Sequence, residues 1–133
     1  MPSPSLESFP IHLGLGATAE ALPQFTGNMD WYASYVEQHE KDGIEGRLVT
    51  QHSFDKPWDS WEMHPHGSEV VICTAGSITL IQEYPDGRIE RITLEPGQYA
   101  INAPGVWHTA DVDHAATAVF ITAGWGTEGR PRE

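Results

Sequence analysis

The side chains that could do chemistry gather in two short segments that lie far apart in the sequence. The first segment, WEMHPHGSE at residues 61–69, contains Glu62, His64, His66 and Glu69. The second segment, APGVWH, ends at His108. Carboxylate oxygen and neutral imidazole nitrogen together suit zinc, iron, manganese or nickel. The two segments therefore predict a site for one divalent transition metal ion.

Two interpretations of this site follow from the residues alone. Alternate side chains of a strand share a face, so Glu62 and His64 are expected to point the same way. His64, Glu69 and His108 would be costly to bury in a barrel without a partner that satisfies their polar atoms. A metal ion meets that need, and a metal-free polar cavity is the alternative.

Around these segments the sequence predicts one helix followed by many strands. The helix is expected from Asn28, which can cap it, to Asp42, with aromatic residues four positions apart on one face. β-branched residues and turn signals then predict strands at residues 47–54, 60–64, 69–84 with a bend at Ala75–Gly76, 88–94, 98–102 and 117–123. Many short strands with regular turns indicate an all-β sandwich or barrel.

The spacing of two motifs resembles that of the cupin superfamily over residues 45–124. Six residues separate Glu69 from Gly76, as in the first family motif. The positions of the second motif, with its proline displaced by one, are occupied by Gly97, Pro104, Gly105 and His108. The resemblance implies a small single-domain cupin, an all-β double-stranded β-helix, or jelly-roll barrel, with one short N-terminal helix.

The resemblance also implies a set of metal ligands, in one of two registers. If Glu62 stands where the family has its first histidine, the ligands are Glu62, His64, Glu69 and His108. If His64 and His66 form the family's His-x-His pair, His66 replaces Glu62 as the fourth ligand. That second register leaves one residue fewer than usual before Glu69.

Three functions are compatible with such a site. The first is a metal-dependent enzyme, an oxygenase, isomerase or lyase, that acts on a small apolar or aromatic molecule. In that enzyme Glu62, where it is not a ligand, would be the general base, since an apolar pocket raises the pKa of a carboxyl group. The alternative is a non-catalytic module that binds or senses a small molecule and acts through a protein partner. A structural dimer stiffened by its metal is the third.

Composition sets the remaining expectations. A chain of 133 residues predicts one domain, at residues 11–133, after an extended Pro- and Ser-rich arm at residues 1–10. A net charge of −12 argues against nucleic acid and anionic membrane surfaces as partners. The N-terminus lacks the features of a secretory leader and no apolar run could span a membrane, so a cytoplasmic location is expected. The resemblance further implies a homodimer, paired through the arm or an exposed strand edge.

Overall fold

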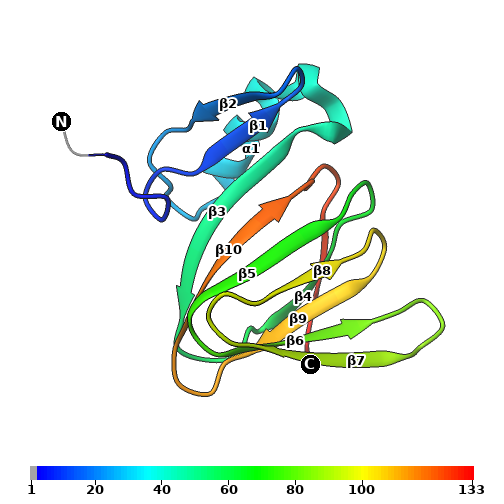
Figure 1. Ribbon diagram of the computed structural model, residues 1–133. Helices are drawn as coiled ribbons and strands as arrows, with labels where there is room; N and C mark the ends of the chain where they lie inside the picture. Colours follow the sequence, from blue (N-terminus) through cyan, green and yellow to red (C-terminus); the bar gives the residue numbers. More distant parts are fainter. Residues whose placement is uncertain (1–2) are drawn as a thin grey trace.

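Two antiparallel β-sheets form the body of the protein in the computed structural model, which describes residues 3–133 (Figure 1). The six-stranded sheet has the order β2 (Thr18–Ala21), β1 (Ile11–Gly14), β3 (Arg47–Phe54), β10 (Ala116–Thr122), β5 (Glu69–Gly76) and β8 (Tyr99–Asn102). The five-stranded sheet has the order β11 (Glu128–Pro131), β4 (Ser60–Met63), β9 (Trp107–Asp111), β6 (Ile78–Glu83) and β7 (Ile89–Leu94). The predicted all-β jelly roll with one short helix is confirmed.

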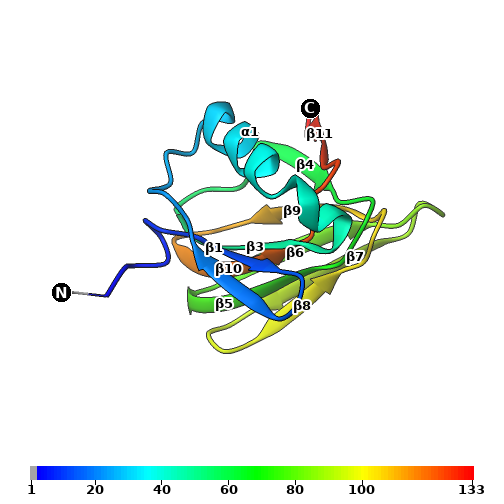
Figure 2. The ribbon, with the colours of Figure 1, turned by 90° about the horizontal axis from the view of Figure 1, so that it is seen from above.

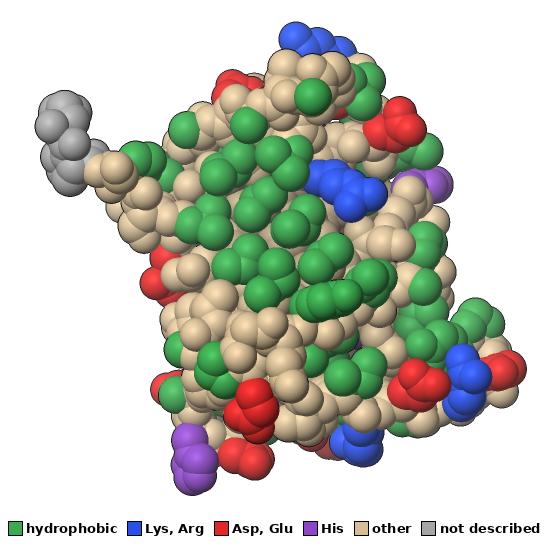
Figure 3. Space-filling model, viewed as in Figure 1, with side chains coloured by type: hydrophobic (Ala, Val, Ile, Leu, Met, Phe, Trp, Pro, Cys, Tyr) green, Lys and Arg blue, Asp and Glu red, His purple; other side chains and the backbone are tan. Residues whose placement is uncertain are grey.

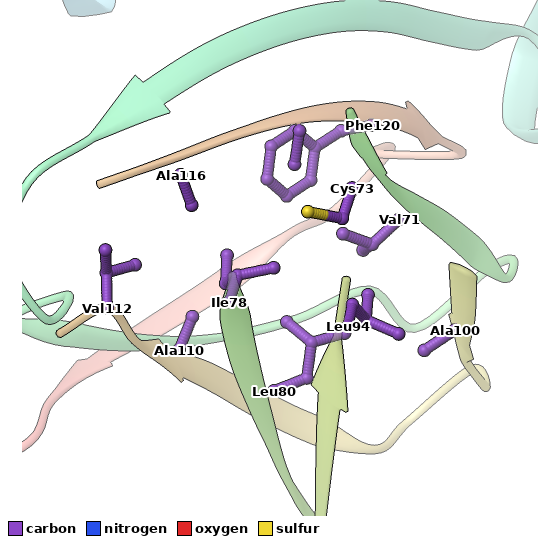
Figure 4. Close-up of a cluster of buried hydrophobic side chains, with 11 residues drawn as sticks. Val71, Cys73, Ile78, Leu80, Leu94, Ala100, Ala110, Val112, Ala116 and Phe120 are labelled. Atoms are coloured by element: carbon purple, nitrogen blue, oxygen red, sulfur yellow. The ribbon is translucent and has the colours of Figure 1, made fainter. Parts of the chain in front are cut away.

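The inward face of β5 is apolar along most of the strand and becomes polar at one end. Val71 and Cys73 of β5 point between the sheets and are fully buried, in a core to which Ile78 and Leu80 of β6 contribute from the opposite sheet (Figure 4). The next inward position of β5 beyond Val71 is Glu69, because inward side chains alternate along a strand. The hydrophobic core therefore gives way to polar groups at one end of these strands.

The helix expected at residues 28–42 is shorter than predicted. α1 spans Met29–Gln38 with the Asn28 side chain as its N-cap, and a 3-10 segment, η1, follows at Glu40–Glu45. The regular helix ends at His39, whose φ of −117° and ψ of 17° are not helical, and Gly43, with a φ of 57°, interrupts the segment that follows. Figure 2 shows α1 on the side of the molecule that carries β4 and β11. Within the described part of the chain, no helix is both long and apolar enough to cross a membrane.

One buried histidine ties the first strand to the helical segment. The Nδ1 atom of His12 lies 2.7 Å from the Tyr35 hydroxyl of α1, and its Nε2 atom lies 2.6 Å from a carboxylate oxygen of Asp42 in η1. A carboxylate can only accept, so Nε2 donates, and this hydrogen bond lowers the pKa of Asp42. His12 thus holds α1 and η1 against β1.

The predicted strands match the observed ones closely, but four short strands are not predicted. The segment expected at residues 69–84 divides at Gly76 into β5 and β6. The unpredicted strands are β1, β2, β9 and β11, of four or five residues each. Gly, Ala and Pro are frequent in β1, β2 and β11, and these residues lower the β-propensity on which the prediction depends.

The expected N-terminal arm lies partly outside the described residues, since residues 1 and 2 are not described. Its remainder contains a turn in which the N–H of Phe9 donates to the carbonyl of Ser5 at 2.8 Å. That this arm helps to pair two copies of the chain stays a prediction.

Replacing Gly76 with alanine is expected to destabilise the fold strongly. Gly76 has a φ of 70°, and a Cβ at this position would overlap the carbonyl group of Ala115 in the neighbouring loop. We expect Gly76→Ala to lower the free energy of unfolding by about 2 to 5 kcal/mol, from backbone strain plus overpacking.

Gly87→Ala is the matched control for this experiment. Gly87 also has a positive φ, of 89°, but a Cβ there would have no described atom within 4 Å. Only the strain of about 1 to 2 kcal/mol is then expected. Urea denaturation of both variants measures the difference, and equal losses of stability would contradict the clash at Gly76.

Candidate metal centre

Strand pairing brings the two chemically important segments together. Glu62 on β4 lies directly opposite His108 on β9, and His64 follows immediately after β4. Ligand atoms of Glu62, His64 and His108 all lie within 4.8 Å of one another. Residues from two distant parts of the sequence thus form one cluster of metal-ligand types.

Glu69, at the start of β5, lies against both histidines of this cluster. Its Oε2 is 3.3 Å from Nε2 of His64 and its Oε1 is 3.1 Å from Nε2 of His108. Glu69 and His64 are each 4% exposed and His108 is fully buried. A carboxylate and two imidazoles therefore meet at a position where their side chains are almost wholly buried.

Hydrogen bonds around the two rings assign their protons. The Thr127 hydroxyl donates to the carbonyl of Gly124 at 2.8 Å, so its oxygen accepts from Nδ1 of His64, also at 2.8 Å. Nδ1 of His108 faces the carbonyl of Val106 at 3.4 Å, and a carbonyl can only accept. In the neutral rings, both Nε2 atoms therefore carry lone pairs, the form in which imidazole binds a metal.

Both Nε2 atoms are buried without a hydrogen-bond partner among residues 3–133, although each is close to Glu69. Lone pairs that face a carboxylate repel it unless a positive charge lies between them. Burial alone would raise the pKa of Glu69, yet hydrogen bonds and positive charge from His108 and His64 in their protonated forms lower it far below the usual range. The carboxylate is thus ionised, and these donors fit a divalent cation.

The same electrostatics act on His108 in the opposite direction. Burial lowers the pKa of His108, but the adjoining Glu69 and the charge of Glu62 outweigh burial, so the net shift is upward. A proton on His108 can therefore compensate the carboxylates when no cation is bound. Metal binding must displace that proton, because a coordinating imidazole is neutral.

Three further polar residues hold the ligands in place, and the sequence does not predict them. The Thr122 hydroxyl donates to Oε2 of Glu69 at 2.7 Å, and the Asn102 amide donates to Oε1 at 3.0 Å. Asn102 in turn accepts a hydrogen bond from the amide of Gln82 at 2.8 Å. A polar residue at an inward position of a strand is the sequence feature that could have identified them. Asn102 and Thr122 occupy such positions of β8 and β10, where apolar residues are usual.

Glu62 and His66, the two alternatives for the fourth ligand, lie in different surroundings. Glu62 is half-buried beside the histidines, and burial together with the charge of Glu69 raises its pKa, against the lowering effect of His108 and His64. His66 is exposed, and it lies beside Gly126 outside the described cluster. Glu62, and not His66, therefore lies beside the two histidines, as a ligand or as a base next to the ion.

A cavity of about 1080 Å³ leads to the cluster, and Glu62, His64 and Glu69 form part of its wall. Phe54, Trp58 and Phe120 form an aromatic wall, with the Trp58 ring centre 5.5 Å from that of Phe54 and 6.0 Å from that of Phe120. Met29, Tyr32 and Val36 line the cavity from α1. The cluster is therefore accessible to a small molecule with an apolar body.

Solved structures similar to this chain share its barrel. An oxalate oxidase in complex with glycolate is 12% identical, with a TM-score of 0.54 over 62% of this chain and 45% of that one. Hydroquinone 1,2-dioxygenase from Sphingomonas sp. TTNP3 is 17% identical, with a TM-score of 0.50 over 57% of this chain and 59% of that one. Peruvianin-I, a cysteine peptidase from Thevetia peruviana latex, is 22% identical, with a TM-score of 0.53 over 64% of this chain and 55% of that one.

These similarities establish the fold class. The chain is a cupin-fold protein, as its motif spacing predicts. This chain spans about half of the length of these solved structures. The similarity concerns the fold and does not extend to their activities. No family model matches the sequence, and no curated protein matches it either.

Thr127→Val is expected to weaken metal binding at least tenfold, because Nδ1 of His64 loses the acceptor that fixes its orientation and tautomer. Titration of metal-free protein with zinc or cobalt measures this affinity. Thr127→Ser keeps the hydroxyl and should bind as the parent does. Equal affinity in the valine variant would show that Thr127 does not position His64.

Proposed function

We propose that this chain is a metal-dependent enzyme acting on a small molecule with an apolar or aromatic body. The observation that carries the proposal is the convergence of His64, Glu69 and His108, deeply buried, on one side of an aromatic-lined cavity. A purely structural site needs no such access. An oxygenase, an isomerase or a lyase would each use this arrangement.

In this proposal His64, Glu69 and His108 hold one divalent transition metal ion. Such an ion, when bound, would act as a Lewis acid and lower the pKa of a hydroxyl group or water molecule. Asn102 and Thr122 keep the Glu69 carboxylate oriented by donating to its two oxygens. The buried surroundings strengthen every charge interaction at the site, because little water is present to screen it.

Glu62 is the group we assign as general base. It lines the cavity next to the two histidines, so its carboxylate can reach a molecule bound there. Burial and the charge of Glu69 raise its pKa, which brings it nearer to the value that suits proton transfer at neutral pH. Glu62 would take a proton from the substrate and return it at another position or to the product.

Trp58 indicates what else the substrate carries. Its indole Nε1 is buried with no hydrogen-bond acceptor in the described chain, and the ring lines the cavity. If the ring turned its Nε1 towards the cavity, an oxygen atom of a bound molecule would satisfy this donor while the ring packs on the apolar body. Oxygenated small molecules are also what the oxalate oxidase and the hydroquinone dioxygenase are named for. Phenols, hydroquinones and hydroxy acids are therefore the compounds to test first.

Replacing Glu62 with glutamine tests the proposal. In Glu62→Gln we expect turnover to fall by at least a hundredfold, the usual contribution of a general base, while the metal content stays unchanged. The assay combines turnover of the phenol, hydroquinone and hydroxy acid panel with elemental analysis of the same samples. Glu90→Gln, an exposed change on β7, is the matched control and should keep full activity.

Two outcomes would contradict this assignment. Loss of the metal in Glu62→Gln would make Glu62 a ligand instead of a base. Stabilisation of the parent protein by a compound that it never converts would favour the non-catalytic binding or sensor module.

A further inference from the structure

The floor of the cavity is the inward face of β3. Every second side chain of this strand lines the cavity, and these side chains are Leu48, Thr50, His52 and Phe54. The first and the last of them are six residues apart, so the floor is roughly 20 Å long. α1 and β4 face it with Tyr32 and Glu62 among their lining residues, and Figure 2 shows both elements on that side. The cavity is therefore elongated along β3.

His52 points into this cavity and not to the outside. Figure 3 shows the outer face of the six-stranded sheet, where hydrophobic side chains gather over the middle. Val49 and Gln51, which alternate with the lining residues of β3, take no part in the cavity wall. His52 lies directly opposite Ala118 of β10, which is fully buried. Directly opposite residues share a face of the sheet, so His52 is directed inward.

The metal centre and His52 lie at different positions along the floor. Leu48 is directly opposite Thr122 of β10, which is directly opposite Glu69 of β5. His52 is four residues further along β3, which is roughly 13 Å, and β3 is two strands away from β5, which is roughly 10 Å. Together these offsets separate the Cα atoms of Glu69 and His52 by roughly 16 Å. Only an elongated molecule can therefore contact both groups.

The imidazole of His52 lies among aromatic rings and lacks a polar partner within residues 3–133. Its ring centre is 5.3 Å from that of Phe25 and 5.8 Å from that of Phe120. Burial lowers the pKa of His52, against the opposing charges of Glu7 and Glu69, and no hydrogen bond contributes to the shift. The neutral ring offers one N–H donor and one lone pair. Both are thus available to a molecule in the cavity.

The other histidines of the cavity wall already have partners. In His12 and in His39, both ring nitrogens are hydrogen-bonded to side-chain or backbone groups. His64 belongs to the metal centre, and its Nδ1 is held by Thr127. Of these four histidines, His52 is therefore the one whose hydrogen-bonding capacity the described chain leaves unused.

We propose that His52 selects the substrate by hydrogen-bonding a second oxygen-bearing group, at the far end of an elongated molecule whose first oxygen meets the metal centre. The substrate class narrows to oxygenated molecules about two linked rings long, with a hydroxyl or carbonyl group at each end. Once such a molecule fills the cavity, a missing second group leaves the imidazole unsatisfied, which costs affinity. The proposal rests on the proposed function for the role of the metal centre, whereas the contact with His52 is measured by binding alone.

Calorimetric titration of the parent protein with para,para′-biphenol and para-phenylphenol tests the proposal. These two probes differ only in the far hydroxyl group. We expect the biphenol to bind about fivefold more tightly, and this preference to disappear in His52→Phe, which keeps an aromatic ring but has no polar atom in it. His52→Gln keeps a donor and an acceptor, so it should retain part of the preference.

Two controls accompany these titrations. Hydroquinone and phenol form the short pair, because hydroquinone cannot reach His52 from the metal centre. Their relative affinity should therefore be the same in the parent protein and in His52→Phe. His114→Phe is the matched variant, since His114 is exposed in the loop before β10, and it should keep the full preference for the biphenol.

Three results would overturn the proposal, with circular dichroism showing that the variants are folded. They are binding of neither long probe, equal affinity of the two for the parent protein, and a preference that survives in His52→Phe. Turnover of the same compounds separates this proposal from the proposed function. Probes that bind with a preference dependent on His52 but are never converted would refute the enzymatic activity alone. Probes that are converted without such a preference would refute the role of His52 alone.

Discussion

The negative charge of Glu69, buried between the imidazoles of His64 and His108, is the constraint on which the rest of the site depends. A carboxylate leaves water only at a cost of several kcal/mol unless a positive charge compensates it. Hydrogen bonds from Thr122 and Asn102 orient the carboxylate but bring no charge. The compensation must come from a proton on the imidazoles or from a cation bound among them, and the unpaired Nε2 atoms favour the cation.

The two sheets share the task of building this site. β5, with its neighbours β8 and β10, supplies Glu69 and the groups that anchor it, and the antiparallel pair β4 and β9 supplies Glu62 and His108. A metal ion would therefore link the two sheets. On β5 and β10, Glu69 and Thr122 point inward to the site, whereas the adjacent residues Val70 and Ile121 point outward, away from the core. The alternation of side chains along each of these two strands thus supplies the site on one side of the sheet and the outer surface on the other.

Sequence reasoning reaches the fold and part of the site, for physical reasons that differ between residues. His64, Glu69 and His108 can be selected as candidates because their spacing resembles that of the two cupin motifs and because such groups are costly to bury without a partner. The choice between Glu62 and His66 cannot be made, because β4 ends before His64 and alternation gives no orientation for a residue in the turn beyond it. Thr127 escapes notice because a threonine in a loop carries no periodic signal. The short strands β1, β2 and β11 escape because they gain their stability from pairing and not from local propensity.

Elemental mass spectrometry of protein purified without a histidine tag tests the central claim most directly. We expect about one equivalent of a transition metal in the parent protein and in His66→Ala, and little or none in His64→Ala and His108→Ala, with all four proteins folded. No metal in any of these proteins, or loss of the metal from His66→Ala alone, would contradict the site described for this chain.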